Sequence, residues 1–239
     1  MTTKAIIIGA TSGIGRSLAD IFLREGYTVG LAGRRIHLLE EVKNNYPDSV
    51  FLKRIDVAQT TEAIDSLETL INEMGGVDIV VVSSGVGFIN RKLEWQPEKK
   101  TIEVNVAGFT AMVNVAMRHF ESKGAGHLVG ISSIAGLRGS SVAPAYGASK
   151  AFISNYLAGM RKKAAQSGLS ITVTEIQPGY VDTDMAKGPG LFWVSSPHQA
   201  AEQIHDAIRR RKKHVYVTKR WRLIAWLLRI MPDFLHNRI

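Results

Sequence analysis

Short runs of β-branched and other apolar residues alternate along this chain with longer stretches of helical periodicity. Such alternation is typical of strands joined by crossover helices, which build a parallel sheet with helices on both faces. The expected strands are Lys4–Gly9, Thr28–Ala32, Val50–Ile55, Asp78–Val82, Gly126–Ser132, Ser170–Gln177 and His214–Thr218. The expected helices lie near residues 13–25, 36–46, 60–74, 97–121, 145–167 and 197–212. The sequence therefore predicts an α/β fold, a doubly wound parallel sheet of about seven strands.

Composition and length limit what this fold can contain. The chain has 239 residues, 45% of them hydrophobic, which suffices for the core of one domain. We expect that domain over residues 1–218 and a basic amphipathic helix in 219–239. Cysteine is absent and the seven histidines show no metal-ligand spacing, so neither a disulfide nor a metal site is expected. No apolar run approaches the ~20 residues that cross a bilayer, and the first ten residues lack the features of a signal peptide, so a cytoplasmic location is expected.

The loop after the first expected strand is rich in glycine and leads directly into a helical pattern. It reads Gly9-Ala10-Thr11-Ser12-Gly13-Ile14-Gly15. Glycines allow a tight turn and let the backbone approach a pyrophosphate, while the free N–H groups at the helix start favour an anion. A plain strand-to-helix turn is the alternative. The glycine-rich loop follows the first strand, and a second strand ends about 20 residues later. This placement favours a Rossmann-type dinucleotide-binding fold over a plain turn.

The end of the second strand selects between two cofactors. An acidic residue there would hold the ribose 2′-OH of NAD, whereas an arginine would pair with the 2′-phosphate of NADP. The sequence has Arg34 and Arg35, and the first carboxylate after them is Glu40. Guanidinium groups bind phosphate oxygens bidentately, so NADP(H) is expected in preference to NAD(H). Arg34 is the expected phosphate partner, whereas Arg35 has the alternative of merely beginning a solvated helix.

Tyr146 and Lys150 stand four residues apart at the start of a helical pattern, so their side chains share one helix face. An ammonium about 4 Å from a phenol contributes about 4 kcal/mol at an effective dielectric near 20, enough to bring the phenol pKa from about 10 to about 7. Ser133 follows the fifth strand at its carboxyl end, where doubly wound folds place ligands. Asn105 lies within a helical stretch, where asparagine has low propensity, and helix packing is its alternative role.

Several short motifs follow one another along most of the chain. In order they are Gly9–Gly15, Asp56 after the third strand, Asn105, Ser133, Tyr146, Lys150, and Pro178-Gly179 followed by Thr183. With this combination, residues 4–218 resemble the compact branch of the short-chain dehydrogenases/reductases. The resemblance implies an NAD(P)-dependent oxidoreductase that acts on a carbonyl or alcohol group. Tyr146 would donate a proton to the carbonyl oxygen, which Ser133 would polarise. Lys150 would lower the tyrosine pKa and bind the nicotinamide ribose, and Asn105 would hold a water that relays protons.

The same resemblance implies the rest of the cofactor site. Asp56 and Val57 would meet the adenine, and Thr183 the nicotinamide carboxamide. The remaining cofactor residues expected here are Ser84, Gly85, Pro178, Gly179 and Val181. Two positions depart from the family pattern. Val82-Ser83-Ser84-Gly85 replaces the usual Asn-Asn-Ala-Gly, and Ser12 stands where NADP-using members often have a basic residue.

Apolar side chains near the expected substrate cleft favour an apolar, lipid-like substrate. They are Val86, Phe88, Leu137, Val142, Phe192 and Trp193. Filling of the core beneath a loop is their alternative role. Glycines and prolines in Lys187–Pro197 indicate a lid over the site. Arg138 is expected to point to solvent, with contact to an acidic group of the substrate as its alternative role.

The net charge of +9 lies entirely in the C-terminal part of the chain. Residues 209–239 hold ten Lys or Arg and one Asp, and the rest of the chain is balanced. Apolar residues between Arg222 and Arg229 suit a helix that lies in an anionic membrane interface, such as the inner membrane surface. Docking on another subunit or over the substrate cleft is equally open, whereas nucleic acid is not expected because no base-reading element is visible.

Two further predictions concern assembly and function. The resemblance implies a homodimer or homotetramer built on the helices near 97–121 and 145–167. A non-catalytic NADP-binding module, tethered to a membrane or a partner by the C-terminal helix, is the alternative function. The complete set of Ser133, Tyr146 and Lys150 favours the enzyme, because a binding module has no need of an acid.

Overall fold

The computed structural model describes residues 2–185, 192–232 and 234, which form the predicted seven-stranded parallel sheet. In spatial order the strands are β3 (Val50–Arg54), β2 (Thr28–Gly33), β1 (Lys4–Ile8), β4 (Ile79–Val82), β5 (Ala125–Ile131), β6 (Ser170–Pro178) and β7 (His214–Val217). All neighbouring pairs run parallel. Each predicted strand is confirmed to within one residue at either end.

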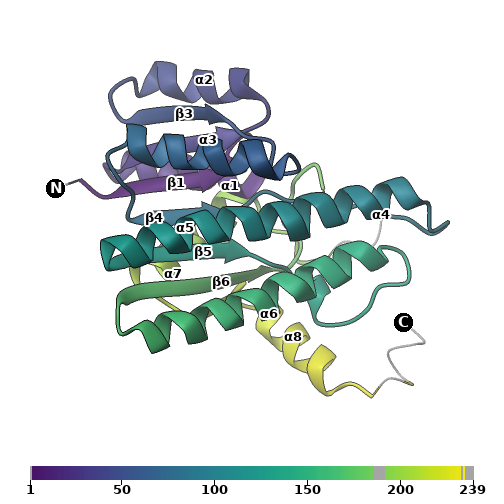
Figure 1. Ribbon diagram of the computed structural model, residues 1–239. Helices are drawn as coiled ribbons and strands as arrows, with labels where there is room; N and C mark the ends of the chain where they lie inside the picture. The colour runs from purple at the N-terminus through teal and green to yellow at the C-terminus, as the bar shows by residue number, and fades with distance from the viewer. Residues whose placement is uncertain (1, 186–191, 233, 235–239) are drawn as a thin grey trace.

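Helices cover both faces of this sheet (Figure 1). One face carries α3 (Thr60–Glu73), α4 (Trp95–Ile102), α5 (Phe109–Lys123) and α6 (Pro144–Ser167). The other face carries α1 (Gly13–Arg24), α2 (Ile36–Asn45) and α7 (Pro197–Arg209). The last helix, α8 (Trp221–Ile230), follows β7 and lies below α6 in the view of Figure 1. Among the described residues, no helix is long and apolar enough to cross a membrane.

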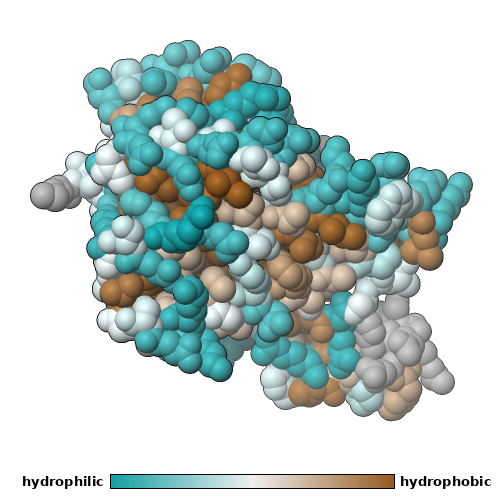
Figure 2. Space-filling model, in the orientation of Figure 1, coloured by the Kyte–Doolittle hydropathy of each residue, from teal (hydrophilic) through white to brown (hydrophobic). Residues whose placement is uncertain are grey.

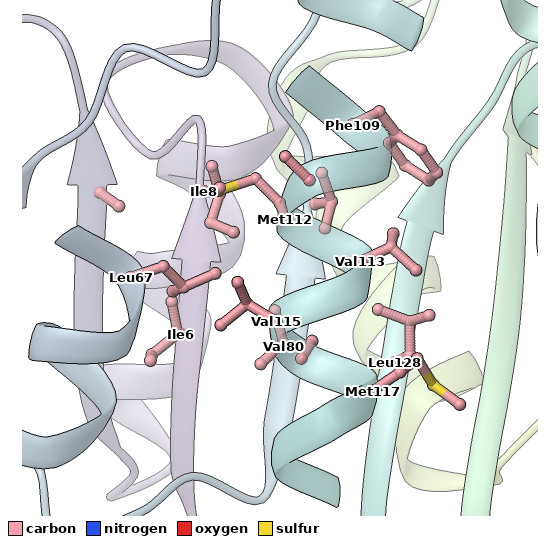
Figure 3. Close-up of a cluster of buried hydrophobic side chains, with 14 of the residues drawn as sticks. Ile6, Ile8, Leu67, Val80, Phe109, Met112, Val113, Val115, Met117 and Leu128 are labelled. Carbon is pink, nitrogen blue, oxygen red and sulfur yellow. The ribbon is translucent and has the colours of Figure 1, made fainter. Parts of the chain in front are cut away.

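The central strands are apolar on both faces because helices bury both of them. Ile6 and Ile8 of β1 belong to the cluster shared with α3 and α5, whereas Ile7 belongs to the cluster shared with α1 and α7. Figure 3 shows the first cluster, in which Leu67 of α3 and Met112 of α5 point toward β1 from neighbouring helices. The uniform apolar runs of the sequence therefore reflect this three-layer arrangement.

A topological switch point lies at the carboxyl end of β1. Ile8 pairs with Ala32 of β2 on one side and with Val82 of β4 on the other, so the chain order reverses across β1. Doubly wound sheets bind ligands in the crevice that opens beyond such a point. The glycine-rich loop after β1 lies there.

The predicted helix near 97–121 is divided into three parts. A π-helical segment, Glu103–Gly108, separates α4 from α5. A Cβ on Gly108 would lie 2.5 Å from the Val57 carbonyl oxygen, so the widened turn lies directly against the loop after β3. Single π-turns within helices often mark functional sites, and this one contains Asn105.

His127 of β5 provides a test of how burial couples to acid stability. Burial lowers the pKa of His127 to about 4, and its Nε2 lies 2.7 Å from the Thr174 hydroxyl oxygen. Between pH 6.5 and 4 the unfolded chain therefore binds more protons than the folded one. We expect the free energy of unfolding to fall by about 3 kcal/mol as the pH drops through that window.

Urea unfolding at several pH values between about 7 and about 4 measures this loss. In His127→Gln, the loss of unfolding free energy between about pH 7 and about pH 4 should be smaller by about 3 kcal/mol. His37→Gln, at an exposed position, should lose as much as the unmodified protein. An unchanged acid loss in His127→Gln would contradict the coupling.

Candidate active site

The loop after β1 is shaped by glycines that no other residue could replace. Gly9 and Gly13 have φ values of 93° and 57°, in the left-handed region. A Cβ on Gly9 would lie 2.6 Å from the Ser84 amide nitrogen, and one on Gly15 would lie 2.2 Å from the Gly9 carbonyl oxygen. The loops after β1 and β4 therefore meet backbone to backbone. Ser12, before α1, makes no side-chain cap, which leaves the first-turn N–H groups of the helix for an anion.

Arg35 reaches across to this loop. Its Nη2 donates hydrogen bonds to the Thr11 and Ser12 hydroxyls at 2.7 and 2.8 Å. Arg35 begins α2 and is exposed, as the alternative role has it, but its guanidinium also contacts the loop, whereas for Arg34, exposed just after β2, no such contact is found in the described part of the chain.

The other predicted cofactor residues surround the same crevice. The Asp56 carboxylate accepts a hydrogen bond from the Ala58 amide at 3.2 Å and turns the chain toward α3. A Cβ on Gly13 would lie 3.0 Å from the Thr183 methyl group, so Thr183 lies over the phosphate loop. The Ser84 hydroxyl oxygen is buried and has no hydrogen-bond partner among the described residues. A tight glycine cradle beside an unpaired buried hydroxyl fits a dinucleotide at this position.

Tyr146 lies in the first turn of α6, and Ser133 follows β5 beside it. Burial raises the pKa of the Tyr146 phenol, and a hydrogen bond with the Ser133 side chain acts in the opposite direction. The Ser133 hydroxyl also accepts a hydrogen bond from the Ala135 amide at 3.1 Å. The structure thus brings together the two hydroxyls that the sequence predicts at one site.

Lys150 lies one turn after Tyr146 and is buried. Its Nζ donates a hydrogen bond to the Ile131 carbonyl oxygen at 3.1 Å and lies 5.7 Å from the centroid of the Tyr146 ring. Burial lowers the pKa of Lys150 to about 8. Burial of the phenol is the largest cause of its pKa shift and the net shift is upward, so the net lowering predicted from the spacing of Tyr146 and Lys150 is not found.

Asn105 connects three segments of the site. Its Oδ1 accepts from the Val86 amide at 2.8 Å, and its Nδ2 donates to the Val86 carbonyl at 2.8 Å and to the Ser149 hydroxyl at 3.0 Å. The Ser149 hydroxyl in turn donates to the Tyr146 carbonyl at 2.8 Å. These contacts give Asn105 the packing role considered for it, and its water-holding role stays a prediction.

Sequence reasoning missed three residues of this site. Ser149 lies between Tyr146 and Lys150, and nothing in the sequence distinguishes it from an ordinary helix serine. The Glu98 carboxylate accepts a hydrogen bond from the Ala145 amide at 3.1 Å and so caps α6 from another helix. Tyr180 lies close enough to Tyr146 for its charge to raise the pKa of that phenol. Only tertiary contacts reveal these roles.

The predicted substrate residues differ in how far they are buried. Val86 packs against the core, so the core-filling alternative holds for it. Leu137 and Val142 are half-buried, whereas Phe88, Phe192 and Trp193 are exposed. Of the predicted lid, residues 187–191 lie outside the described residues. Its end is held by a parallel bridge between Val181 and Ser195.

The C-terminal helix enters this region through Trp221, which sequence reasoning also missed. Trp221 is buried, and a Cβ on Gly179 would lie 2.1 Å from its ring. Its ring centroid lies 5.0 Å from that of Phe192 and 5.3 Å from that of Tyr180. The prediction that Arg138 points to solvent is wrong, because its guanidinium donates to the carbonyl groups at the end of α8.

Comparison with known proteins agrees with this geometry. Residues 3–190 match the family model described as short chain dehydrogenase. An uncharacterized oxidoreductase of Myxococcus xanthus is 32% identical over 96% of this chain and 92% of its own length. A short chain dehydrogenase of Burkholderia cenocepacia, solved in complex with NADP, superposes with a TM-score of 0.85 at 20% identity, covering 99% of this chain and 97% of that one. An alcohol dehydrogenase of Thermococcus sibiricus, complexed with 5-hydroxy-NADP, gives a TM-score of 0.81 at 22% identity over 91% and 96% of the two chains. The chain therefore belongs to the short-chain dehydrogenase family and is an oxidoreductase of that family.

Proposed function

We propose that this oxidoreductase transfers hydride between NADP(H) and a carbonyl or alcohol carbon of an apolar substrate. The observation that carries this proposal is the juxtaposition of Ser133, Tyr146 and buried Lys150 at the carboxyl end of β5, beside the crevice between β1 and β4. When bound, the reduced nicotinamide supplies the hydride, and the chain supplies orientation, a proton and a partner for the developing oxyanion.

Each of the three side chains has a separate task in reduction. Tyr146 would give its phenolic proton to the substrate oxygen, and its raised pKa keeps that proton in place at neutral pH. Ser133 would donate a hydrogen bond to the same oxygen. The Lys150 ammonium would stabilise the phenolate that remains and bind the ribose hydroxyls. Asn105 and Ser149 hold the start of α6 so that the phenol stays beside Ser133.

The test of this function is consumption of NADPH in the presence of ketones and aldehydes with alkyl chains of increasing length. We expect turnover, with kcat/KM rising along the series, because the exposed Phe192 and Trp193 offer apolar surface beside the site. If neither carbonyls with NADPH nor alcohols with NADP⁺ react while the nucleotide binds, the non-catalytic NADP-binding module is the correct description.

Preference for NADP(H) follows from the arginines at the end of β2. The Arg35 side chain donates hydrogen bonds to the Thr11 and Ser12 hydroxyls of the glycine-rich loop. The preceding residue, Arg34, is exposed. The NADP named with two structures of similar fold agrees with this preference.

Arg35→Ala is expected to weaken NADPH binding by about 10- to 100-fold, since a charge-assisted bidentate contact is lost. NADH binding should change much less, because NADH has no 2′-phosphate. Dissociation constants from nicotinamide fluorescence measure both, and Lys43→Ala, an exposed cation of α2, is the matched control. An equal loss for both nucleotides would assign Arg35 to the loop alone and contradict the phosphate role.

The assembly and location that we propose follow the sequence predictions. A homodimer or homotetramer would use the outer faces of α5 and α6, and the protein would work in the cytoplasm. Light scattering of the purified protein measures its oligomeric state.

A further inference from the structure

Helix α8 carries an apolar stripe that nothing in the described part of the chain covers. The stripe consists of Leu223, Trp226, Leu227 and Ile230, which are 67%, 62%, 44% and 56% exposed. These residues recur at helical spacing on the side opposite Trp221 and Ala225, the two buried residues of the helix. Figure 2 shows brown apolar side chains over α8 at the lower edge of the molecule, with teal hydrophilic ones beside them.

The stripe cannot be buried by a simple rotation of the helix. Trp221 is inserted over Gly179, where it contacts Phe192 and Tyr180, and this fixes the first turn. At the other end, Arg138 donates a hydrogen bond to the Leu228 carbonyl at 2.7 Å and another to the Met231 carbonyl. Both ends of α8 are thus attached to the body, and the apolar stripe is held outward.

Charge indicates what kind of surface the stripe meets. Arg222 and Arg229 are seven residues apart and exposed, so both flank the stripe on one side. Lys219 and Arg220 lie just before the helix and are also exposed. A second copy of this chain would bring the same cationic segment against this one, and like charges would oppose the contact. An anionic partner is therefore favoured over self-association.

The length and composition of α8 fit a lipid surface. Ten residues of helix span about 15 Å, half of a bilayer's hydrocarbon core, so α8 can lie in the interface but cannot cross it. Tryptophan and leucine on one face with arginines at its edge are typical of interfacial helices. We propose that α8 binds flat on an anionic lipid surface, with the apolar stripe below the headgroups and Arg222 and Arg229 at the phosphates.

Sedimentation of the intact protein with lipid vesicles tests this surface. We expect binding to phosphatidylcholine vesicles that contain phosphatidylglycerol, weaker binding to phosphatidylcholine alone, and weakening by salt. Leu223→Ser with Trp226→Ser should lower the partition coefficient by about 10- to 100-fold, because two apolar side chains no longer enter the interface. Arg222→Glu with Arg229→Glu should lower it by about 10-fold or more for anionic vesicles only.

Matched control variants distinguish binding through the apolar stripe of α8 from non-specific binding to vesicles. Trp95→Ser removes an exposed tryptophan on α4, and Lys99→Glu with Lys100→Glu reverses two exposed charges there. Both should bind vesicles like the unmodified protein. Quenching of tryptophan emission by brominated acyl chains should largely disappear in Trp226→Phe, and circular dichroism should show each variant folded.

Three results would overturn the assignment. One is failure of the intact protein to bind anionic vesicles at low salt, and another is equal binding by the Leu223→Ser, Trp226→Ser variant. The third is a smaller oligomer for the Leu223→Ser, Trp226→Ser variant while the intact protein binds no lipid. That result would mean that the stripe packs against a second copy of the chain. None of these readouts depends on turnover, so they remain distinct from failure of the proposed reaction.

Discussion

Replacement of Tyr146 by phenylalanine is expected to reduce turnover by roughly 10²- to 10⁴-fold, the usual contribution of general acid–base catalysis. The phenol shares a hydrogen bond with the Ser133 side chain, and burial raises its pKa, so it is protonated throughout the neutral range. The substitution removes one oxygen and leaves the ring, which fits closely against Gly87. NADPH binding should therefore persist, and the loss should appear in kcat with any active carbonyl substrate.

Tyr156→Phe is the matched control for this experiment. Tyr156 lies on the same helix, and its hydroxyl donates to the Asn114 side chain at 2.8 Å, away from the crevice. It should retain turnover. Steady-state kinetics and nucleotide titration on the two variants distinguish a catalytic phenol from a structural one. Undiminished turnover in Tyr146→Phe would remove the acid from the proposed reaction.

The fold was predictable because it depends on patterns that are local in sequence. Strands such as Ile79–Val82 are uniformly apolar since helices bury both faces, and the alternation of such strands with helices predicted the doubly wound parallel sheet. The shape of the first loop was predictable for a similar reason, because the close backbone approaches at Gly9 and Gly15 leave no room for a side chain. In both cases the structural requirement lies within one short segment, so the residue types of that segment reveal it.

The remaining parts of the site depend on contacts between distant segments. The hydrogen bonds of Arg35 could not be predicted from its neighbours, because its two hydroxyl partners lie 23 and 24 positions earlier. Arg138 binds carbonyl groups about 90 positions later, on a helix whose docking has no sequence signature. The electrostatic prediction for Tyr146 and Lys150 used a spacing alone, and burial, which spacing does not reveal, reversed its sign.

Replacement of Lys150 by methionine is expected to lower activity and raise stability at the same time. An ammonium 5.7 Å from the phenol ring contributes about 3 kcal/mol at an effective dielectric near 20, which corresponds to about 100-fold in rate once the phenol becomes a phenolate. Burial, however, lowers the pKa of Lys150 from 10.5 to about 8, so the charged form destabilises the fold. Methionine keeps much of the volume without the charge.

The sign of the stability effect depends on pH in a defined way. Between pH 8 and 10.5 the unfolded chain holds a proton on Lys150 that the folded chain has released, so the free energy of unfolding rises with pH across that window. Below pH 8 both states are charged, and the buried ammonium costs about 3 kcal/mol. Loss of its hydrogen bond to the Ile131 carbonyl offsets about 1 kcal/mol, leaving a net gain of about 2 kcal/mol for Lys150→Met near neutral pH.

Thermal unfolding should thus give a Tm about 4–8 °C higher for Lys150→Met near pH 7, with the difference shrinking toward pH 10.5. Lys162→Met, at an exposed position of the same helix, should show neither the gain nor the loss of activity. Stabilisation together with a large fall in kcat would mean that the fold tolerates this buried cation for the sake of the reaction. A destabilised and inactive variant would instead make Lys150 a structural residue, since a merely structural contact cannot raise stability when it is removed.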